Sequence, residues 1–337
     1  MTGAGSLALV DPCCARGYAP AALQAGGLGG TEATVLRVTS VLSTRMPVVH
    51  YQRGRTDTVA TDAGLMRPLA DAFAPDAAGT FVVINAWKVA CKLRRAHPAA
   101  RIVLWLHVHP GRHNRPMATA LAQAGVAVVC VSASHAATLR AFLSHGPALA
   151  IDHIHNPIAD GLAPDATPHD PDALLFASAP HKGLVQVYAR FTAARQAIPS
   201  LTLAVADPGY LAWDTGPVPD GVTLLGAMPH AALIARMRRS LCLFYPQTRF
   251  AETFGLVMAE AQAVGLPVLA HCGLGANDEV VGPGQLLDCH DDAQIVTRLQ
   301  DWRRARPVVG ANPAFRLSAV CDRWMALLDG AAMERVA

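Results

Sequence analysis

Short apolar runs that alternate with helical stretches most constrain the fold of this chain of 337 residues. The runs are nearly continuous in apolar residues, which is typical of parallel strands buried on both faces of a sheet. Strand–helix alternation repeated this often predicts an α/β protein with doubly wound sheets. The predicted strands lie at residues 6–10, 47–51, 80–85, 101–108 and 126–132 in the first half and at 173–177, 201–206, 222–225, 240–246 and 267–270 in the second.

The composition changes between residues 156 and 172. This stretch carries four prolines, four aspartates and few apolar groups, which is typical of a linker. We therefore predict one Rossmann-like domain over residues 1–155 and a second over 156–313, followed by a C-terminal helical stretch over 314–337 that could cross back to the first domain. Ligands of such sheets bind at the carboxyl ends of the strands, so we expect the site in a cleft between the two domains.

Cysteine and charge usage indicate the compartment and the partners. The eight cysteines form no C-x-x-C pair and several lie in apolar runs, which favours free thiols in the cytoplasm. Neither a basic n-region nor an apolar run of about 18 residues occurs, so we expect no signal peptide and no membrane span.

Residues 1–150 hold 14 Lys and Arg against six Asp and Glu, a net charge of +8, whereas the remainder holds 14 against 19, a net −5. This asymmetry predicts an anionic partner for the first half, with random surface placement as the alternative.

Glu252 and Glu260 belong to a segment that predicts a helix from about Phe254 to Val264, ended by Gly265. Eight helical residues separate the two carboxylates by roughly 12 Å, too far for a catalytic pair acting on one bond. The spacing suits two hydroxyl-bearing groups joined by an anionic spacer at the helix N-terminus, which is the layout of a nucleoside diphosphate sugar. The alternative is that Glu252 only complements the helix dipole and Glu260 is solvated.

An ordered set of segments resembles a known family. The segments are GGLGGTEATVLRVTSVL (26–42), RIVLWLHVHP (101–110), VVCVSASHAATL (128–139), HNPIADG (155–161), FASAPHKGLVQVYARF (176–191) and LLGAMPHAALIARMRRSLCLFYPQTRFAETFGLVMAEAQAVGLPVLA (224–270). Together they resemble the retaining GT-B glycosyltransferases with the E-x(7)-E signature, of the group 1 or family-four type. The resemblance implies two Rossmann-like domains facing across a cleft, with the acceptor bound by the first and a nucleotide-sugar donor by the second.

The same resemblance implies roles for individual residues. Glu252 would contact the hydroxyls of the donor sugar, and Glu260 those of the ribose, through charge-assisted hydrogen bonds. Lys182 would bind the diphosphate and stabilise the charge of the leaving group. The other predicted donor-binding residues are Gly29, Gly30, Arg249, Phe254, Gly255, Leu256 and Met228, the last of which lies in the loop from Gly226 to His230 that matches where the base packs against backbone.

Two of these predictions have open alternatives. The family usually carries an arginine about five residues before the lysine, and Ala177 stands at that place here. Either Arg249 or an arginine of the first domain compensates, or diphosphate binding is weaker than usual. Gly29 and Gly30 precede a predicted helix, where glycines let a phosphate approach backbone N–H groups; a flexible loop is the alternative.

His107 ends the predicted strand 101–108, and its imidazole is expected to point into the cleft. The resemblance places it beside the donor sugar, as a catalytic residue together with Glu252 and Lys182. His109, Arg112 and His113 are predicted to contact the acceptor. A metal bound by His107, His109 and His113 is an alternative, but no acidic partner follows nearby, and we predict no metal and no cofactor.

The predicted reaction is transfer of a hexose from a UDP- or GDP-sugar to an acceptor hydroxyl with retention of configuration, in bacterial glycan biosynthesis. The resemblance implies that the leaving diphosphate helps to deprotonate the acceptor. A GT-B phosphorylase would need a cofactor lysine near the C-terminus, and none follows Lys182. A GT-B epimerase and a non-catalytic nucleotide-sugar-binding subunit stay open.

The acceptor is predicted to be a glycan or a lipid-linked group that is anionic, with no nucleic acid as partner. Peripheral contact with the inner face of the membrane is part of the same prediction. The basic residues expected to bind such an acceptor are Arg53, Arg55, Lys88, Lys92, Arg94, Arg95, Arg112 and Arg115.

Overall fold

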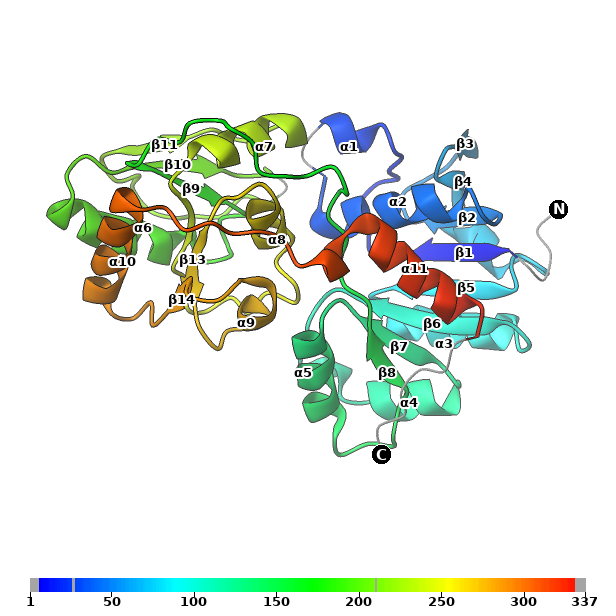
Figure 1. Ribbon diagram of the computed structural model, residues 1–337. Coiled ribbons are helices and arrows are strands. Elements are labelled where there is room, and N and C mark those ends of the chain that lie inside the picture. The colour runs from blue at the N-terminus through cyan, green and yellow to red at the C-terminus, as the bar shows by residue number, and fades with distance from the viewer. Residues whose placement is uncertain (1–5, 26–27, 210, 331–337) are drawn as a thin grey trace. The chain divides into compact units, whose positions relative to one another are not determined.

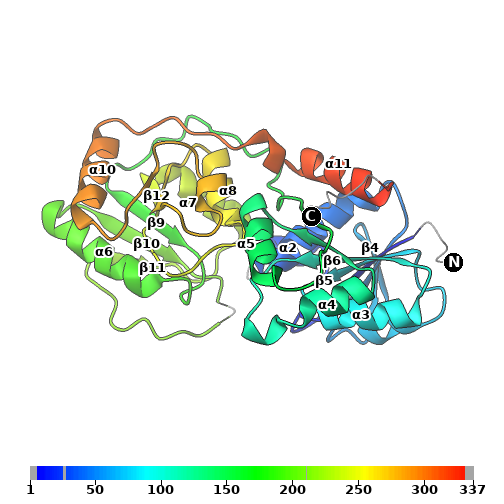
Figure 2. The same ribbon diagram turned by 90° about the horizontal axis from the view of Figure 1, so that it is seen from below.

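Strands at the predicted positions form two sheets in the computed structural model, which describes residues 6–25, 28–209 and 211–330 (Figures 1 and 2). The chain divides into a first unit of Met1–Ala22, Gly30–Pro157 and Leu317–Ala337, and a second unit of Leu23–Gly29 and Ile158–Arg316. The predicted boundaries after residues 155 and 313 thus lie two and three residues earlier than those of the units. The predicted α/β class with two parallel sheets is confirmed.

The first unit is built on an eight-stranded sheet in the order β3-β4-β2-β1-β5-β6-β7-β8. The neighbours are parallel except for β3 and β4, which form an antiparallel edge. The apolar runs predicted in the first half become β1, β2, β5, β6 and β7, and every residue of β1 and β2 is buried, as expected for inner parallel strands. The bounds are β1 (Leu7–Asp11), β2 (Val48–Gln52), β3 (Val59–Thr61), β4 (Gly64–Pro68), β5 (Thr80–Ile84), β6 (Arg101–Leu106), β7 (Ala127–Cys130) and β8 (Ile151–His153).

Helices cover both faces of this sheet (Figures 1 and 2). Helices α2 (Gly30–Leu42) and α11 (Leu317–Leu328) pack together on one face, and α3 (Trp87–Ala96) and α4 (Met117–Gln123) pack together on the other. Helix α5 (Ala133–Leu143) lies against β7 and β8, and the Ser132 side chain caps it by accepting from the His135 N–H. The Trp324 ring of α11 lies 4.6 Å from that of Trp105 in β6, so the C-terminal helix belongs to the core of the first unit.

The second unit holds a six-stranded, all-parallel sheet in the order β11-β10-β9-β12-β13-β14. Its helices include α6 and α10, which pack together, and α7 and α8, which form a second pair (Figure 1). The bounds are β9 (Ala173–Ala177), α6 (Leu184–Ala197), β10 (Thr202–Ala206), β11 (Val222–Leu224), α7 (His230–Arg239), β12 (Cys242–Tyr245), α8 (Leu256–Ala263), β13 (Val268–His271), α9 (Asn277–Val280), β14 (Leu286–Leu287) and α10 (Asp292–Arg304).

In both units the residues predicted to carry chemistry follow the carboxyl ends of strands, where doubly wound sheets bind ligands. His107 follows β6 of the first sheet, whereas Lys182 and Glu252 follow β9 and β12, which are neighbours in the second. Across the part of the chain that the structure describes, no helix has the length and apolar character needed to cross a membrane.

Candidate functional site

Lys182 and Glu252 form an ion pair at the carboxyl edge of the second sheet. The Lys182 Nζ lies 2.9 Å from Oε1 and 3.0 Å from Oε2 of Glu252. The hydroxyl of Tyr245, the last residue of β12, donates to the same Oε1 at 2.9 Å. Glu252 is only 7% exposed, so its charge is stabilised by a cation and a phenol instead of by water. Tyr245 was not predicted; its position at the end of an apolar run, just before the loop, is the signal that points to it.

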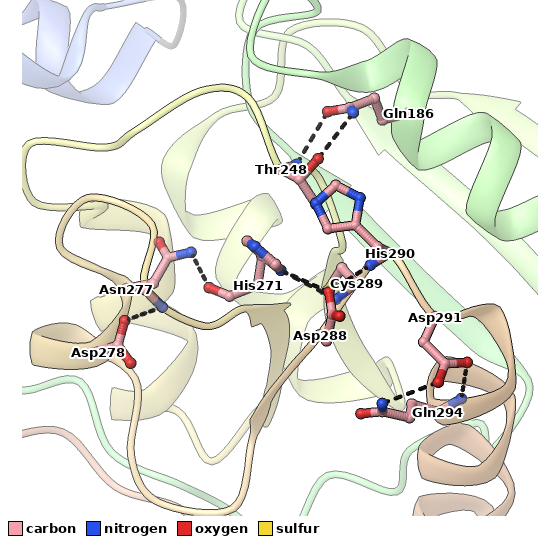
Figure 3. A network of polar contacts seen from close by, with 11 residues as sticks. Gln186, Thr248, His271, Asn277, Asp278, Asp288, Cys289, His290, Asp291 and Gln294 are labelled. Atoms are coloured by element: carbon pink, nitrogen blue, oxygen red, sulfur yellow. Dashed lines mark hydrogen bonds and ion pairs between the residues drawn. The ribbon is translucent and has the colours of Figure 1, made fainter.

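The loop that carries Glu252 is held by two glutamines. The Gln247 Oε1 accepts from the N–H groups of Arg249 and Phe250 at 3.0 and 2.7 Å. From α6, the Gln186 amide binds both the N–H and the hydroxyl of Thr248, at 3.1 and 3.2 Å (Figure 3). The loop therefore has a fixed path, and the Phe250 ring on it lies 4.9 Å from the Lys182 Nζ.

Two glycines allow this loop to pack closely. Gly183, next to Lys182, has a φ of 92°, and a Cβ there would lie 2.5 Å from the Cβ of Gln247. Gly275 has a φ of 57°, and a Cβ there would lie 2.5 Å from the backbone oxygen of Glu252. Any other residue at either position would displace the backbone around the ion pair.

The helix after Glu252 is shorter than predicted. Helix α8 begins at Leu256 instead of Phe254, because Gly255 adopts a left-handed conformation with a φ of 91° that a helix cannot contain. Glu252 consequently lies in the preceding loop, and the predicted spacing of roughly 12 Å, which assumed a continuous helix, does not apply. Glu260 lies within α8, is 4% exposed and has its Oε1 2.9 Å from the Nε2 of His230. Glu260 is therefore not the solvated helix residue of the alternative interpretation.

The other predicted donor-binding residues differ in their exposure to solvent and in the unit to which they belong. Phe254 and Gly255 are buried, Leu256 and Met228 are half-buried, and Arg249 is exposed. Gly29 is part of the second unit, whereas Gly30 begins α2 of the first, and a Cβ on Gly30 would meet open space. Gly26 and Gly27, the other pair of this loop, lie outside the described residues.

The edge of the first sheet carries neutral polar groups. His107 is 7% exposed, and burial, helped by the nearby His135, lowers its pKa to about 3. Burial also lowers the pKa of His135 to about 4. Both imidazoles are therefore neutral at pH 7, and His107 cannot serve there as an imidazolium acid.

Asn85, directly after β5, was not predicted. Its side-chain Oδ1 accepts from the backbone N–H of His107 at 2.7 Å, and its own N–H donates to the Trp105 carbonyl at 3.0 Å. Asn85 has a φ of 57°, a conformation that is uncommon outside glycine. A residue in such a conformation marks a place where the surroundings hold the backbone, and here it fixes the chain at His107. The signal in the sequence is the polar residue that ends the run TFVVIN.

The three residues predicted to contact the acceptor take no part in this hydrogen bond. The His109 ring packs against His135, with centroids 4.9 Å apart. Arg112 and His113 are exposed in a short 3-10 helix, Arg112–Asn114, which is tied to α3 by a hydrogen bond of 2.9 Å from Trp87 Nε1 to Asn114 Oδ1. Their predicted role stays a prediction.

Two of the eight basic residues assigned to an anionic acceptor serve the fold instead. The Arg55 side chain, 8% exposed, contacts Asp57 at 2.8 Å and donates to Gln52 Oε1 at 2.9 Å. Arg94 donates to the backbone carbonyls of Ala100 and Ala124 at 2.6 and 2.8 Å. The other six, which are exposed, are Arg53, Lys88, Lys92, Arg95, Arg112 and Arg115.

One group of metal-ligating residue types lies within the second unit (Figure 3). The ligand atoms of His271, Asp288 and His290 are within 4.8 Å of one another. However, the Nδ1 of His271 already accepts from the N–H of Cys289 at 3.1 Å. This arrangement does not fit a metal ligand, whose second nitrogen normally donates to an oxygen.

Comparisons with known proteins agree with this architecture. Residues 172–307, within the second unit, match the family described as Glycosyl transferases group 1. The fold is similar to that of AviGT4, a glycosyltransferase involved in avilamycin A biosynthesis, at 17% identity and a TM-score of 0.58 over 98% of this chain and 100% of that chain. It is also similar to WaaG, a glycosyltransferase involved in lipopolysaccharide biosynthesis, at 13% identity and a TM-score of 0.57 over 96% and 100%.

A third similar structure is the pneumococcal O-GlcNAc transferase GtfA in complex with UDP and GlcNAc, at 13% identity and a TM-score of 0.54. That alignment covers 74% of this chain but only 57% of GtfA, so the chain spans less than two thirds of that protein's length. No curated protein matches the sequence. The family match thus concerns residues 172–307 of the second unit, and the similar structures show that the chain has the fold of GT-B glycosyltransferases.

Proposed function

We propose that the protein transfers a hexose from a UDP- or GDP-sugar to an acceptor hydroxyl with retention of configuration. The observation that carries the proposal is the Lys182–Glu252 pair, held by Tyr245 at the carboxyl edge of the sheet that matches the group 1 family. A lone buried carboxylate would be costly, so the pair keeps both charges at the site before a donor arrives. When the donor binds, Lys182 would turn to the diphosphate and Glu252 would accept from sugar hydroxyls.

Glu260 and His230 form the second anchor of the proposed donor site. The Glu260 carboxylate is buried, and its contact with His230 fixes one oxygen, so the carboxylate can bind a ribose without first having to be ordered. Vicinal hydroxyls that donate to a carboxylate make charge-assisted hydrogen bonds, which are shorter and stronger than neutral ones. Donor binding would thus use two carboxylates on one helix–loop segment.

His107 would act as a neutral hydrogen-bonding group in this proposal. With a pKa of about 3 it cannot donate a proton as an imidazolium at pH 7, and its low basicity makes it a poor general base. Deprotonation of the acceptor is therefore assigned to the leaving diphosphate, and Lys182 stabilises the charge that develops there. The scheme requires no protein nucleophile.

The acceptor is proposed to be anionic and to bind the exposed basic residues of the first unit. Lys88, Lys92 and Arg95 are exposed on α3, and the bond between Trp87 and Asn114 ties this helix to the segment of Arg112 and Arg115. Exposed charges are screened over about 10 Å at 0.1 M salt, so acceptor affinity should fall as salt rises. An affinity that does not change between low and moderate ionic strength would indicate a neutral acceptor.

The experiment that tests the function begins with thermal unfolding against a panel of nucleotide sugars. A donor at 100 times its Kd adds roughly 2.7 kcal/mol to the free energy of unfolding. The stabilising donor is then incubated with and without candidate acceptors, and the anomeric configuration of the product is read by NMR. Transfer with inversion would contradict retention, turnover without an acceptor would indicate an epimerase, and binding without any turnover would indicate a binding subunit.

A further inference from the structure

An exposed tryptophan borders the proposed donor site. Trp213 is 55% exposed and lies between β10 and β11, in a segment that follows the carboxyl end of β10. A bulky aromatic ring gains most from burial, so a ring left in water beside a ligand site is available to bury against a ligand. Trp213 has no role in the reaction scheme above.

Aromatic rings connect Trp213 with the Lys182–Glu252 pair. The Trp213 ring centroid lies 6.0 Å from that of His181, the residue before Lys182. His181 in turn meets the Phe250 ring edge-on at 5.6 Å, and this ring faces the Lys182 ammonium. Burial and the Lys182 charge lower the pKa of His181, so an uncharged ring is favoured next to Trp213.

The start of the same segment lies beside the loop that precedes His230. A Cβ on Gly209 would lie 3.9 Å from the Cβ of Ala227, so the start of the segment packs on the loop that leads to His230. Two local hydrogen bonds of 2.9 Å stabilise the segment on either side of Trp213: Gly209 N–H to Asp207, and Gly216 N–H to Asp214. The segment of Trp213 thus starts beside the loop before His230, and its Trp213 ring lies beside His181, the neighbour of Lys182.

We propose that Trp213 stacks on the nucleobase of the donor, an inference that rests on the proposed function. Lys182 accounts for the diphosphate, Glu252 for the sugar and Glu260 for the ribose, which leaves the flat face of the base to be covered. Aromatic side chains stack on any base, because every base has a π-face. Trp213 therefore contributes affinity for nucleotides in general, and the choice between UDP and GDP is made elsewhere.

The test compares a ligand that has a base with one that has none. Affinities for UDP, GDP and pyrophosphate are measured by calorimetry for the wild type and for Trp213→Ala, Trp213→Phe and Trp213→Leu. Stacking predicts that Trp213→Ala weakens UDP and GDP by at least about fivefold, the lower end of what base stacking contributes, and leaves pyrophosphate unchanged. Trp213→Phe should keep most of the affinity, and Trp213→Leu should lose it despite a similar apolar character.

Leu211→Ala is the matched control, because Leu211 is 42% exposed on the same segment but carries no ring. It should bind all three ligands as the wild type does, and thermal unfolding should show all variants folded. Unchanged UDP affinity in Trp213→Ala, or an equal loss of pyrophosphate affinity, would overturn the stacking proposal and leave the proposed function standing. A wild type that binds neither nucleoside diphosphates nor nucleotide sugars would overturn the proposed function itself.

Discussion

The two units place polar groups near the carboxyl ends of their parallel strands but stabilise them in opposite ways. At the edge of the first sheet, His107 and His135 are kept neutral by burial. At the edge of the second, Glu252 and Glu260 are each paired with a basic side chain, Lys182 and His230. A neutral ring can be buried at little cost, whereas a buried charge needs a partner. The first edge is therefore suited to hydrogen bonding and the second to holding a charged ligand.

Removing the cation of the second edge should have the largest effect. We expect Lys182→Ala to lose about 10²–10³ in kcat, as is typical when a group that stabilises transition-state charge is removed. Lys182→Arg should be partly active, because the charge persists with another geometry. Arg249→Ala should be the second most damaging basic substitution of the second unit, because Arg249 is exposed on the same loop.

Lys182→Ala also leaves Glu252 buried without its cation, so stability has to be measured beside activity. Lys182→Met combined with Glu252→Gln removes both charges and controls for the unpaired carboxylate. If Lys182→Ala transfers at more than about a third of the wild-type rate, far above the expected loss, Lys182 has no role at the diphosphate.

The neutral histidines of the first unit should make the protein sensitive to acid. Burial lowers the pKa of His50 to about 4, and that of His107 and His135 to about 3 and 4. The unfolded chain then binds more protons than the folded protein below pH 6.5, so stability is full above that pH and falls as the pH drops towards 4. Each group can cost on the order of 3 kcal/mol once the pH is below its folded pKa.

The acid effect is measured by denaturant unfolding between pH 7 and pH 4, with a spectroscopic signal from the first unit as the readout. His50 has no part in the proposed reaction and its Nε2 bonds the Ala63 carbonyl at 3.0 Å, so His50→Gln keeps a donor but cannot titrate. This variant should lose stability less steeply with acid than the wild type. An identical pH profile for the two proteins would mean that His50 is not held neutral.

Removing the Glu260 carboxylate, the second anchor of the proposed donor site, should raise the KM for the donor. A hydrogen bond to a charged group contributes about 1.5–3 kcal/mol, so Glu260→Ala should raise KM by roughly ten- to a hundredfold with little change in kcat. Ribose contacts exist in both the ground and the transition state, which is why the effect should fall on binding. Glu260→Gln keeps an acceptor oxygen, so its KM should lie between those of the wild type and Glu260→Ala. A defect confined to kcat would contradict the ribose assignment.

Asn85 gives a smaller test of the first edge. Asn85→Gly keeps the backbone conformation and loses the acceptor, Asn85→Asp keeps both, and Asn85→Ala loses both. If Asn85 positions His107, Asn85→Gly should lower kcat by about threefold to tenfold, the worth of one hydrogen bond, and Asn85→Asp should restore activity.

Asp76 is the matched control, because it is the other described non-glycine residue with a positive φ, at 56°. Asp76→Ala should lower stability through backbone strain, and neither Asp76→Ala nor Asp76→Gly should change kcat. If the variants of Asn85 and of Asp76 lose activity in the same proportion as they lose stability, Asn85 has only a structural role.

The difference between the two edges was only partly predictable from the sequence. Buried parallel strands read directly as apolar runs, and a lysine or glutamate after such a run stands out. Tertiary contacts cannot be predicted in this way, because their partners are far apart in the sequence. Glu252 pairs with Lys182, 70 positions away, and Asn85 bonds His107, 22 positions away. The start of α8 also depends on the conformation of Gly255, which the Ala-rich helical pattern conceals. The neutrality of His107 arises from burial, and no local pattern encodes it.

The smallest expected effect is that of chelation. Charge at the second edge is balanced by Lys182, a cation that belongs to the chain, so we expect transfer to continue at the wild-type rate in EDTA. The group of His271, Asp288 and His290 is the place in the second unit where a metal would most readily be sought, but the engaged Nδ1 of His271 argues against it. Asp288→Asn and His290→Ala should therefore leave both activity and thermal stability unchanged, with and without EDTA. Loss of activity on chelation, restored by manganese or magnesium and abolished by these substitutions, would show that a metal at this group, and not Lys182 alone, supplies the positive charge.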